Sequence, residues 1–411
     1  MSATSTAAAA AVSKALASQL AEAKAHCTSP AFFQEAAPIF NEWTLHNILT
    51  FVAGMCTLFT MTLSFGLAIF HLANYVNPVE QKQFVRIVIT PAVFAIFNFF
   101  GVWFYDAAPY LEPIADYYEI FALVALFYLC LNYATPEEGQ REAFFRELER
   151  IDARKKTKLH NQGSLRWFYV IWFLVFQSLV SRFFTTISTW VSTATLCPLN
   201  HDIIYAKVII SVIESFSTSL ALTGIITFCT RLRPIMRAHQ VLAKLVTFKL
   251  IVFIQIIQTV IFPALSQAGV FTPAKTVAID DWTVGIPAFL TCCEMLIFSV
   301  AFLHPFRPGP YLPPKGADSN SMESLHAAGS QYQQRHGFWH ALLDVLNLWD
   351  ILSGIWFHYA VVPYFFHKDY NEAGMPAAGG LKVIESESSG SAPEWNQESQ
   401  TAKNLRMAQD N

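Results

Sequence analysis

Seven long apolar stretches alternate with polar connections between residues 47 and 305. A membrane-spanning helix needs roughly 20 consecutive, mostly apolar residues. The stretch from Trp282 to Leu303 meets this requirement and carries one ionisable residue, Glu294, near its centre. The pattern predicts an all-α membrane protein built as a seven-transmembrane helix bundle, with a kink at Pro91 in the second span. The spans are expected at residues 47–70, 84–105, 117–134, 167–190, 202–228, 248–267 and 282–303.

Basic residues are distributed unequally among the connections between these spans. Residues 135–166 contain eight Lys and Arg, and basic residues also follow the first, fifth and seventh spans. The connections after the second and fourth spans contain none, and the one after the sixth contains only Lys275. Because cytoplasmic loops are enriched in Lys and Arg, we expect the N-terminus outside and the C-terminus in the cytoplasm.

Residues 338–366 are apolar enough to be considered as an eighth span. Asp344 and Asp350 would then each lie in lipid, at a cost of roughly 2.5–3.5 kcal/mol. These two residues share one narrow helical face with His340, Asn347 and Gly354. The pattern therefore favours an amphipathic helix on the cytoplasmic surface, with an eighth span as the alternative.

The remaining residues are polar, and the last 45 include the run ESESSGSAPEWNQESQ, which is typical of disorder. The predicted parts of the chain are an extracytoplasmic polar tail (1–46), the seven-transmembrane bundle (47–305), a proline-rich and polar linker (306–337), the interfacial amphipathic helix (338–366) and a disordered cytoplasmic tail (367–411).

The composition agrees with a lipid-facing protein and narrows its chemistry. The chain is 54% hydrophobic and 14% charged, whereas soluble proteins average roughly 25% charged residues. No nucleotide-binding fingerprint, nucleophile elbow or metal-ligand spacing occurs, so we expect no enzyme activity, cofactor, metal site or nucleic-acid partner. Of the seven cysteines, only Cys27 and Cys197 lie on the predicted outer side. They are the predicted disulfide, with two free thiols as the alternative.

Several charged residues lie inside the predicted spans. Counted from the outer surface, Glu294 and Glu214 are each about 12 residues deep, and Arg182 is about eight residues deep. This difference is about 6 Å, which a long Arg side chain can bridge to either glutamate. Such a network predicts a path or pocket for an organic ion; a buried ion pair that only fixes helix packing is the alternative. With the more outward Lys207 and Glu119, the predicted path consists of Glu294, Glu214, Arg182, Lys207, Glu119 and Gln177.

The connection between the first two spans reads HLANYVNPVEQKQFVRIVITP (71–91), and the third span begins with YEIF (118–121). Together with HQVLAKLVTFKLIVFIQIIQTVIF (239–262) and LLDVLNLWD (342–350), these runs resemble the organic solute transporter alpha-subunit (Ost-alpha) family, in a fungal-type member. The resemblance implies a seven-helix transporter that moves amphipathic solutes such as steroid conjugates down their gradients. It also implies a single-span beta-type subunit as a partner. The residues that carry the resemblance are His71, Asn77, Pro78, Glu80, Gln81, Arg86 and Tyr118.

The run NPVEQ also has a purely structural interpretation. Asn77 and Pro78 favour a turn, and Glu80 would follow in the first turn of a helix, where a carboxylate suits the helix dipole. Arg86 is expected either to reach lipid headgroups or to pair with Glu80. A role in gating is the alternative.

Together with the charged residues inside the spans, the resemblance implies a facilitative transporter of amphipathic organic solutes, such as steroid conjugates, organic anions or lipid-like molecules. A seven-helix receptor has the same topology, but the third span ends LCLNYATPEEG, without an Asp-Arg-Tyr box. A membrane-trafficking or lipid-organising scaffold is the other alternative. The expected partners are membrane lipids, the organic solute, and a beta-type subunit or a second copy of the chain. The expected location is the plasma membrane or a vacuolar or endosomal membrane.

Overall fold

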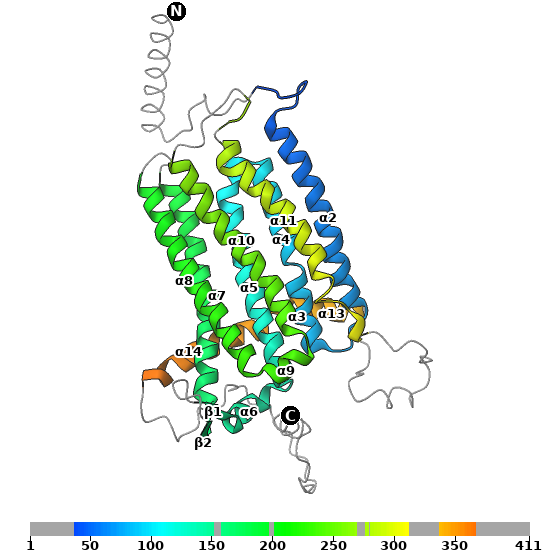
Figure 1. The fold of residues 1–411 in the computed structure, drawn as a ribbon, viewed down its shortest axis with the longest axis vertical. Coiled ribbons are helices and arrows are strands. Elements are labelled where there is room, and N and C mark those ends of the chain that lie inside the picture. The colour runs from blue at the N-terminus through cyan, green and yellow to red at the C-terminus, as the bar shows by residue number, and fades with distance from the viewer. Residues whose placement is uncertain are drawn as a thin grey trace, which may run out of the picture.

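The computed structural model describes residues 37–151, 158–196, 201–268, 276–278, 280–311 and 337–366. Within these residues, seven helical segments are long and apolar enough to cross a membrane, which confirms the predicted fold class. Figure 1 shows them side by side in one bundle. They are α2 (Leu45–Ala73), α3 with α4 (Pro78–Val88 and Thr90–Trp103), α5 (Ala108–Ala134), α7 (Leu165–Thr195), α8 (His201–Arg231), α10 (Val241–Gln267), and α11 (Ile286–Phe302) with the preceding π-turn η4 (Asp281–Gly285).

Shorter elements connect the spans and follow them. Two of them, β1 and β2, form an antiparallel pair. The shorter elements are η2 (Tyr105–Ala107), η3 (Glu138–Gln140), α6 (Arg141–Glu147), β1 (Glu149–Ile151), β2 (Lys158–Gly163), α9 (Arg233–Ala238), η5 (Gly309–Tyr311), α13 (Phe338–Leu346) and α14 (Trp349–Phe366).

The two ends of the bundle differ in charge. We call the end that carries Asp106, Asp280 and Asp281 the acidic end, and the end that carries Arg141 and Arg231 the basic end. The acidic end is the predicted outer side and the basic end the predicted cytoplasmic side.

Proline residues shape two of the spans. The second is divided into α3 and α4 at Ile89, as the prediction of a kink at Pro91 requires, because proline lacks the N–H that would continue the helix. The third begins at Ala108 rather than at residue 117. Pro109 stands in its first turn, where a missing N–H costs nothing, and Pro113 is accommodated within the helix. The additional residues place two more carboxylates on a spanning helix.

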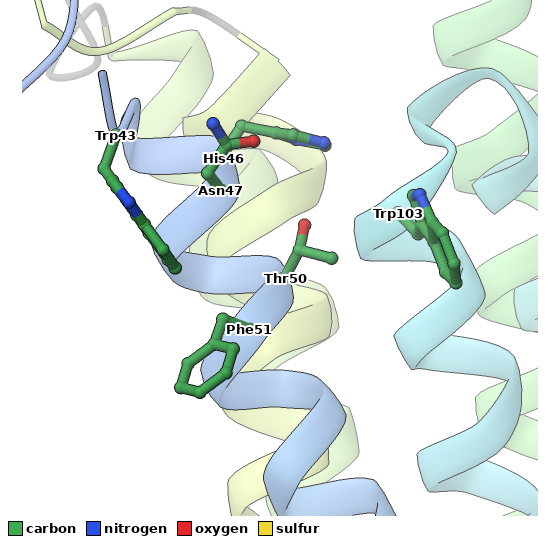
Figure 2. Close-up of a pocket in the computed structure, with 6 residues that line it drawn as sticks. All are labelled: Trp43, His46, Asn47, Thr50, Phe51 and Trp103. Carbon is green, nitrogen blue, oxygen red and sulfur yellow. The ribbon is translucent and has the colours of Figure 1, made fainter.

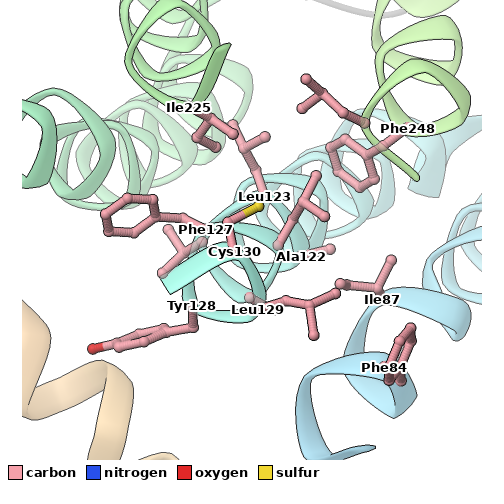
Figure 3. Close-up of a cluster of buried hydrophobic side chains, with 14 of the residues drawn as sticks. Phe84, Ile87, Ala122, Leu123, Phe127, Tyr128, Leu129, Cys130, Ile225 and Phe248 are labelled. Atoms are coloured by element: carbon pink, nitrogen blue, oxygen red, sulfur yellow. The ribbon is translucent and has the colours of Figure 1, made fainter. Parts of the chain in front are cut away.

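Helix α5 lies at the centre of the bundle. Every residue from Ala122 to Cys130 is buried, and α5 packs against α3, α4 and α7. Figure 3 shows the side chains around this segment, with Phe127 on α5, Ile225 on α8 and Phe248 on α10. A helix that is apolar on all sides is typical of such a buried position. Glu119, three residues before this segment, is thereby held inside the bundle.

Small residues let the other helices approach one another closely. Helices α7 and α8 share the most extensive contact of any two elements in the described residues. A side chain at Gly224 of α8 would meet Leu174 of α7 at 3.3 Å. Because lipid is as apolar as the side chains, helix association in membranes depends on such packing and on polar contacts.

Helices α13 and α14 form a collar at the basic end, where α14 runs across the bundle axis (Figure 1). We predicted one helix over residues 338–366, but the structure has two, because Asn347 ends α13 and its side chain accepts a hydrogen bond from the Trp349 N–H at 3.0 Å. The collar packs on α2, α3 and α7. Its acidic face points toward α3, and its exposed apolar residues include Trp339, Leu343, Leu346, Trp349, Leu352 and Trp356.

Candidate functional site

Four ionisable residues lie at nearly the same depth, measured from the acidic end of the bundle. Glu119 is eleven residues from the start of α5, and Glu214 is thirteen residues from the start of α8. Arg182 is thirteen residues before the end of α7, and Glu294 is thirteen residues after the start of η4. At a rise of 1.5 Å per residue these positions are about 17–20 Å deep. We call this level the polar layer.

Arg182 is the centre of one half of the polar layer. Its guanidinium Nη1 lies 2.8 Å from the Glu214 carboxylate and 3.9 Å from the Asp116 carboxylate. Its Nη2 donates to the Thr218 hydroxyl at 3.4 Å. The Arg182 side chain is 9% exposed, so these contacts satisfy a charge that would otherwise be costly inside a membrane. The structure therefore pairs Arg182 with Glu214, and not with Glu294.

Glu119 belongs to the same group. The residue is 5% exposed and interacts electrostatically with Arg182, Asp116 and Glu214. Its Oε1 has no hydrogen-bond partner in the described part of the chain. We predicted that Glu119, like Lys207, lies nearer the outer surface than Arg182, Glu214 and Glu294. For Glu119 this is wrong, because α5 begins nine residues earlier than expected.

Gln177 and Lys207 of the predicted path lie on the same two helices as Arg182 and Glu214. Gln177 on α7 and Ser217 on α8 exchange hydrogen bonds: Gln177 Nε2 donates to the Ser217 carbonyl, and the Ser217 hydroxyl donates to Gln177 Oε1, both at 2.9 Å. Gln177 therefore joins two helices. Lys207 is exposed near the acidic end and interacts electrostatically with Glu112 of α5.

Glu294 forms a separate polar group between α10 and α11. Its Oε1 accepts a hydrogen bond from Gln258 at 2.6 Å, and the Thr291 hydroxyl donates to the same glutamine at 3.4 Å. Glu294 Oε2 is buried without a hydrogen-bond partner among the described residues. The carboxylate pairs with α10 because α11 packs on α2, α4 and α10.

A hollow of about 350 Å³ lies between α2 and α4 near the acidic end. Figure 2 shows Trp103 on α4 facing the α2 residues across it. None of its lining residues belongs to the predicted path. The lining residues are Trp43, His46, Asn47, Thr50, Phe51 and Trp103.

The residues of the family motif mostly fix the connection between α2 and α3. Asn77 caps α3, where Pro78 is the first residue, by accepting from the Glu80 N–H at 3.4 Å. The fully buried Gln81 accepts from the Val76 and Asn77 N–H groups, both at 2.8 Å. It donates to the carbonyls of His71 and Asn74 at 3.3 and 2.8 Å. One side chain thus satisfies four backbone groups of this turn.

Other motif residues connect distant segments at the basic end. The His71 ring shares a 2.9 Å hydrogen bond through Nε2 with the Phe306 carbonyl. Glu80 accepts from the Tyr311 hydroxyl at 2.6 Å, and burial together with the Glu80 charge raises the pKa of Tyr311. These contacts hold the segment after α11 against the start of α3.

Arg86 binds the collar. It is 2% exposed, and its Nη1 lies 2.7 Å from Asp350 of α14. The predicted pairing with Glu80 or with lipid headgroups is wrong, because the collar covers Arg86 and offers it a carboxylate. The Tyr118 hydroxyl donates to the Arg86 carbonyl at 2.8 Å.

Lys82 completes this contact, at 3.3 Å from Asp344 and 3.8 Å from Asp350. Burial alone would raise the pKa of Asp350, but its hydrogen bonds and attraction to Arg86 and Lys82 outweigh burial and lower it.

Sequence reasoning missed Asp116 as a partner of Arg182 and Lys82 in the collar contact. Asp116 could have been found from its spacing, because it lies three residues before Glu119 and therefore near it on a helix. Lys82 had no local signal, since its partner Asp344 is 262 residues away. The predicted disulfide partners, Cys27 and Cys197, lie outside the described residues.

Comparison with known proteins agrees with this architecture. The family model described as Organic solute transporter Ostalpha matches residues 49–311, from within α2 to beyond α11. Protein LAZ1 of Arabidopsis thaliana is 27% identical over 286 residues, which cover 64% of this chain and 58% of that relative. The match thus spans less than two thirds of that relative's length. No solved structure matches the chain. Because the matched segment is well over half of the chain and runs from the first span to the last, this integral multi-pass membrane protein belongs to the Ostalpha organic solute transporter family.

Proposed function

We propose that the chain is a facilitative transporter of amphipathic organic solutes, a class that includes steroid conjugates, other organic ions and lipid-like molecules. The observation that carries the proposal is the polar layer, in which Arg182, Glu214 and Glu119 lie about midway along mostly apolar helices. Charged residues at that depth are costly and usually line substrate or ion pathways. The family supplies the transporter-type role, and the layer supplies a place where a polar head group can cross.

The layer is better suited to transport than to packing alone. A buried ion pair adds little net stability over apolar residues of similar size, and two hydrogen bonds between Gln177 and Ser217 already join α7 and α8. Those two helices already pack closely through small residues such as Gly224. Glu119 and Glu294 each retain a buried carboxylate oxygen without a hydrogen-bond partner among the described residues.

The remaining features of the proposal follow the topology. The bundle over residues 47–305 would carry the solute, with the acidic end outside and the collar in the cytoplasm. Membrane lipids, a single-span beta-type subunit or a second copy of the chain are the proposed partners. The proposed location is the plasma membrane or a vacuolar or endosomal membrane.

Uptake into proteoliposomes that contain the purified chain tests this proposal. The probes are a labelled steroid sulfate and a labelled neutral steroid, compared for wild type, Glu294→Gln, Glu214→Gln and the control Glu42→Gln. Glu42 is an exposed carboxylate before α2, so it matches the chemical change without touching the layer. We expect saturable uptake that stops at equal concentrations on both sides and falls at least about tenfold in a layer variant. Glu214→Gln removes the charged partner of Arg182, and Glu294→Gln removes the charged acceptor of the Gln258 hydrogen bond; a hydrogen bond to a charged group is worth about 1.5–3 kcal/mol.

Two results would contradict the proposal. Uptake that equals that of empty liposomes for both probes, with or without co-reconstituted beta-type subunit, argues against transport of this solute class. Uptake that is unchanged in both layer variants would show that the solute does not pass through the layer. Thermal unfolding of each variant shows whether the variant is folded before its uptake is compared.

A lipid-organising scaffold is the second candidate, and the collar is the observation that favours it. The outward face of α13 and α14 exposes Trp339, Trp349 and Trp356, and exposed tryptophans are typical of the membrane interface. A triple Trp→Ala variant that keeps normal uptake but loses a lipid-dependent function in cells would favour the scaffold. Loss of uptake in the same variant would favour the transporter.

A further inference from the structure

One face of α5 carries three carboxylates that lead from the acidic end to the polar layer. Glu112, Asp116 and Glu119 are spaced i, i+4 and i+7, which places them on the same side of an α-helix. Their exposure falls with depth: Glu112 is exposed, the Asp116 side chain is 40% exposed, and Glu119 is 5% exposed. We call these three residues the acidic ladder.

Carboxyl groups outnumber positive groups at the inner part of the ladder. Glu119 interacts electrostatically with Asp116 and Glu214, and Arg182 is the single positive group among its interaction partners. The same guanidinium already pairs with Glu214 and Asp116. Three carboxylates therefore share one cation inside the membrane-spanning bundle, where uncompensated charge is costly. The group is one that a positive ligand would stabilise.

The inner end of the ladder also has unused hydrogen-bonding capacity. Glu119 Oε1 is buried without a hydrogen-bond partner in the described part of the chain. An ionised carboxylate accepts hydrogen bonds and needs a donor, which an N–H group of a ligand would supply.

We propose that the acidic ladder binds the ammonium group of an amphipathic amine, with Glu119 as its innermost ligand. An ammonium group brings both the positive charge and the N–H donors that the site lacks. The inference rests on the proposed function and narrows the solute to molecules with a cationic head group.

Other charged ligands fit this site less well. A metal ion such as Ca²⁺ needs six or more converging oxygen ligands, and no group of three or more His, Cys, Asp or Glu side chains in the described ranges is placed to hold one. An anionic head group would have to displace Glu214 or Asp116 from Arg182 and would then face the excess of carboxylates.

Equilibrium binding to the full chain in nanodiscs tests the inference separately from transport. The probes are 2-phenylethylamine, 3-phenylpropionate and 2-phenylethanol, which share an aromatic body and differ in head group. The readout is the apparent Kd, taken from the rise in thermal unfolding temperature with ligand concentration. The variants are Glu119→Gln and Asp116→Asn, with Glu42→Gln as the control at the same end of the bundle. Asp116→Asn serves if Glu119→Gln does not fold, because Asp116 is more exposed.

We expect the amine to stabilise wild type and Glu42→Gln, and to bind at least about tenfold more weakly to either ladder variant, because each loses a charge-assisted hydrogen bond. The acid and the alcohol should give little stabilisation. Equal stabilisation by all three probes would overturn the inference. Amine binding that is unchanged in the ladder variants would also overturn it. So would a result in which added Na⁺ or a lower pH stabilises the chain and the amine then gives no further stabilisation. Amine binding without uptake of the labelled amine or of either steroid would leave the binding site standing and reject transport. Steroid uptake without amine binding would reject this inference alone.

Discussion

Replacing Arg86 with Met should detach the collar from the bundle while leaving the seven spans in place. Arg86 donates to both Asp350 carboxylate oxygens, at 2.7 and 3.2 Å, and to the carbonyls of Val345 and Asn347, at 3.2 and 2.6 Å. One side chain on α3 therefore holds the end of α13, the break at Asn347 and the start of α14. Met keeps the length and apolar stem of Arg but removes the charge and every one of these donors.

The expected magnitude follows from the burial of the pair. Removing one partner of a buried ion pair costs about 3–5 kcal/mol, because the other charge stays buried without compensation. Lys82 remains 3.8 Å from Asp350, and Gln83 donates to Asp350 at 3.1 Å. We therefore expect the lower part of the range, about 3 kcal/mol. Since each 1.4 kcal/mol is a factor of ten, local opening of the collar should become about 100-fold more frequent.

Hydrogen exchange of the α13 and α14 amides in nanodiscs measures this local opening. Exchange in the collar should accelerate about 100-fold in Arg86→Met and remain near wild type in α5. Arg233→Met is the matched control, because Arg233 is an exposed arginine at the same end of the bundle.

A double-mutant cycle with Asp350→Asn separates the pair from the other contacts of Arg86. The double variant should lose at least about 1 kcal/mol less than the sum of the single losses, as contacting residues do. Unchanged collar exchange in Arg86→Met would refute this account of the collar, and strict additivity would refute the ion pair as its main contact.

Three further predictions concern the basic end. Gly354→Ala should accelerate collar exchange by an amount that corresponds to about 1–3 kcal/mol, because a Cβ at Gly354 would collide with two aromatic side chains of α5 and α7; normal exchange would contradict this. Since Arg86 and Lys82 lower the pKa of Asp350, collar docking should be constant above about pH 4, the ordinary Asp value, and be lost as the pH falls through the lowered pKa. Tryptophan fluorescence on acidification measures this, and loss of docking near pH 6 would refute it. Gln81→Leu leaves four backbone groups without their partner and should destabilise the chain by at least about 2 kcal/mol, seen as a lower unfolding temperature; an unchanged temperature would show that water replaces the side chain.

The features that the bilayer imposes could be predicted from the sequence. Each span must be long and apolar, so the seven helices follow from hydropathy. The ion pair between Arg182 and Glu214 follows from counting residues along two helices that are consecutive in the chain. The same count gave Glu294 an equal depth, but depth does not identify a lateral neighbour. The partner of Glu294 is Gln258 because of the order in which the helices pack, and that order has no signature in the sequence of either helix.

The start of α5 could not be predicted from hydropathy alone. Residues 108–116 include two prolines and two carboxylates, and together these are typical of a loop. They are helical here because Pro109 lies in the first turn and because Asp116 finds Arg182 across the bundle. The error hid the acidic ladder, since a helix that begins at residue 117 carries only Glu119.

Buried charges are balanced at the collar contact but not at the polar layer. At the collar, Lys82 and Arg86 face Asp344 and Asp350, so the charges balance. At the layer, Arg182 alone faces Glu214, Glu119 and the neighbouring Asp116, and Glu119 keeps an oxygen without a hydrogen-bond partner in the described ranges. The imbalance is therefore not a general property of how this protein packs polar groups. Violations of packing rules are expected where function requires them, and the layer is the place where a ligand that brings positive charge would restore the balance already present at the collar.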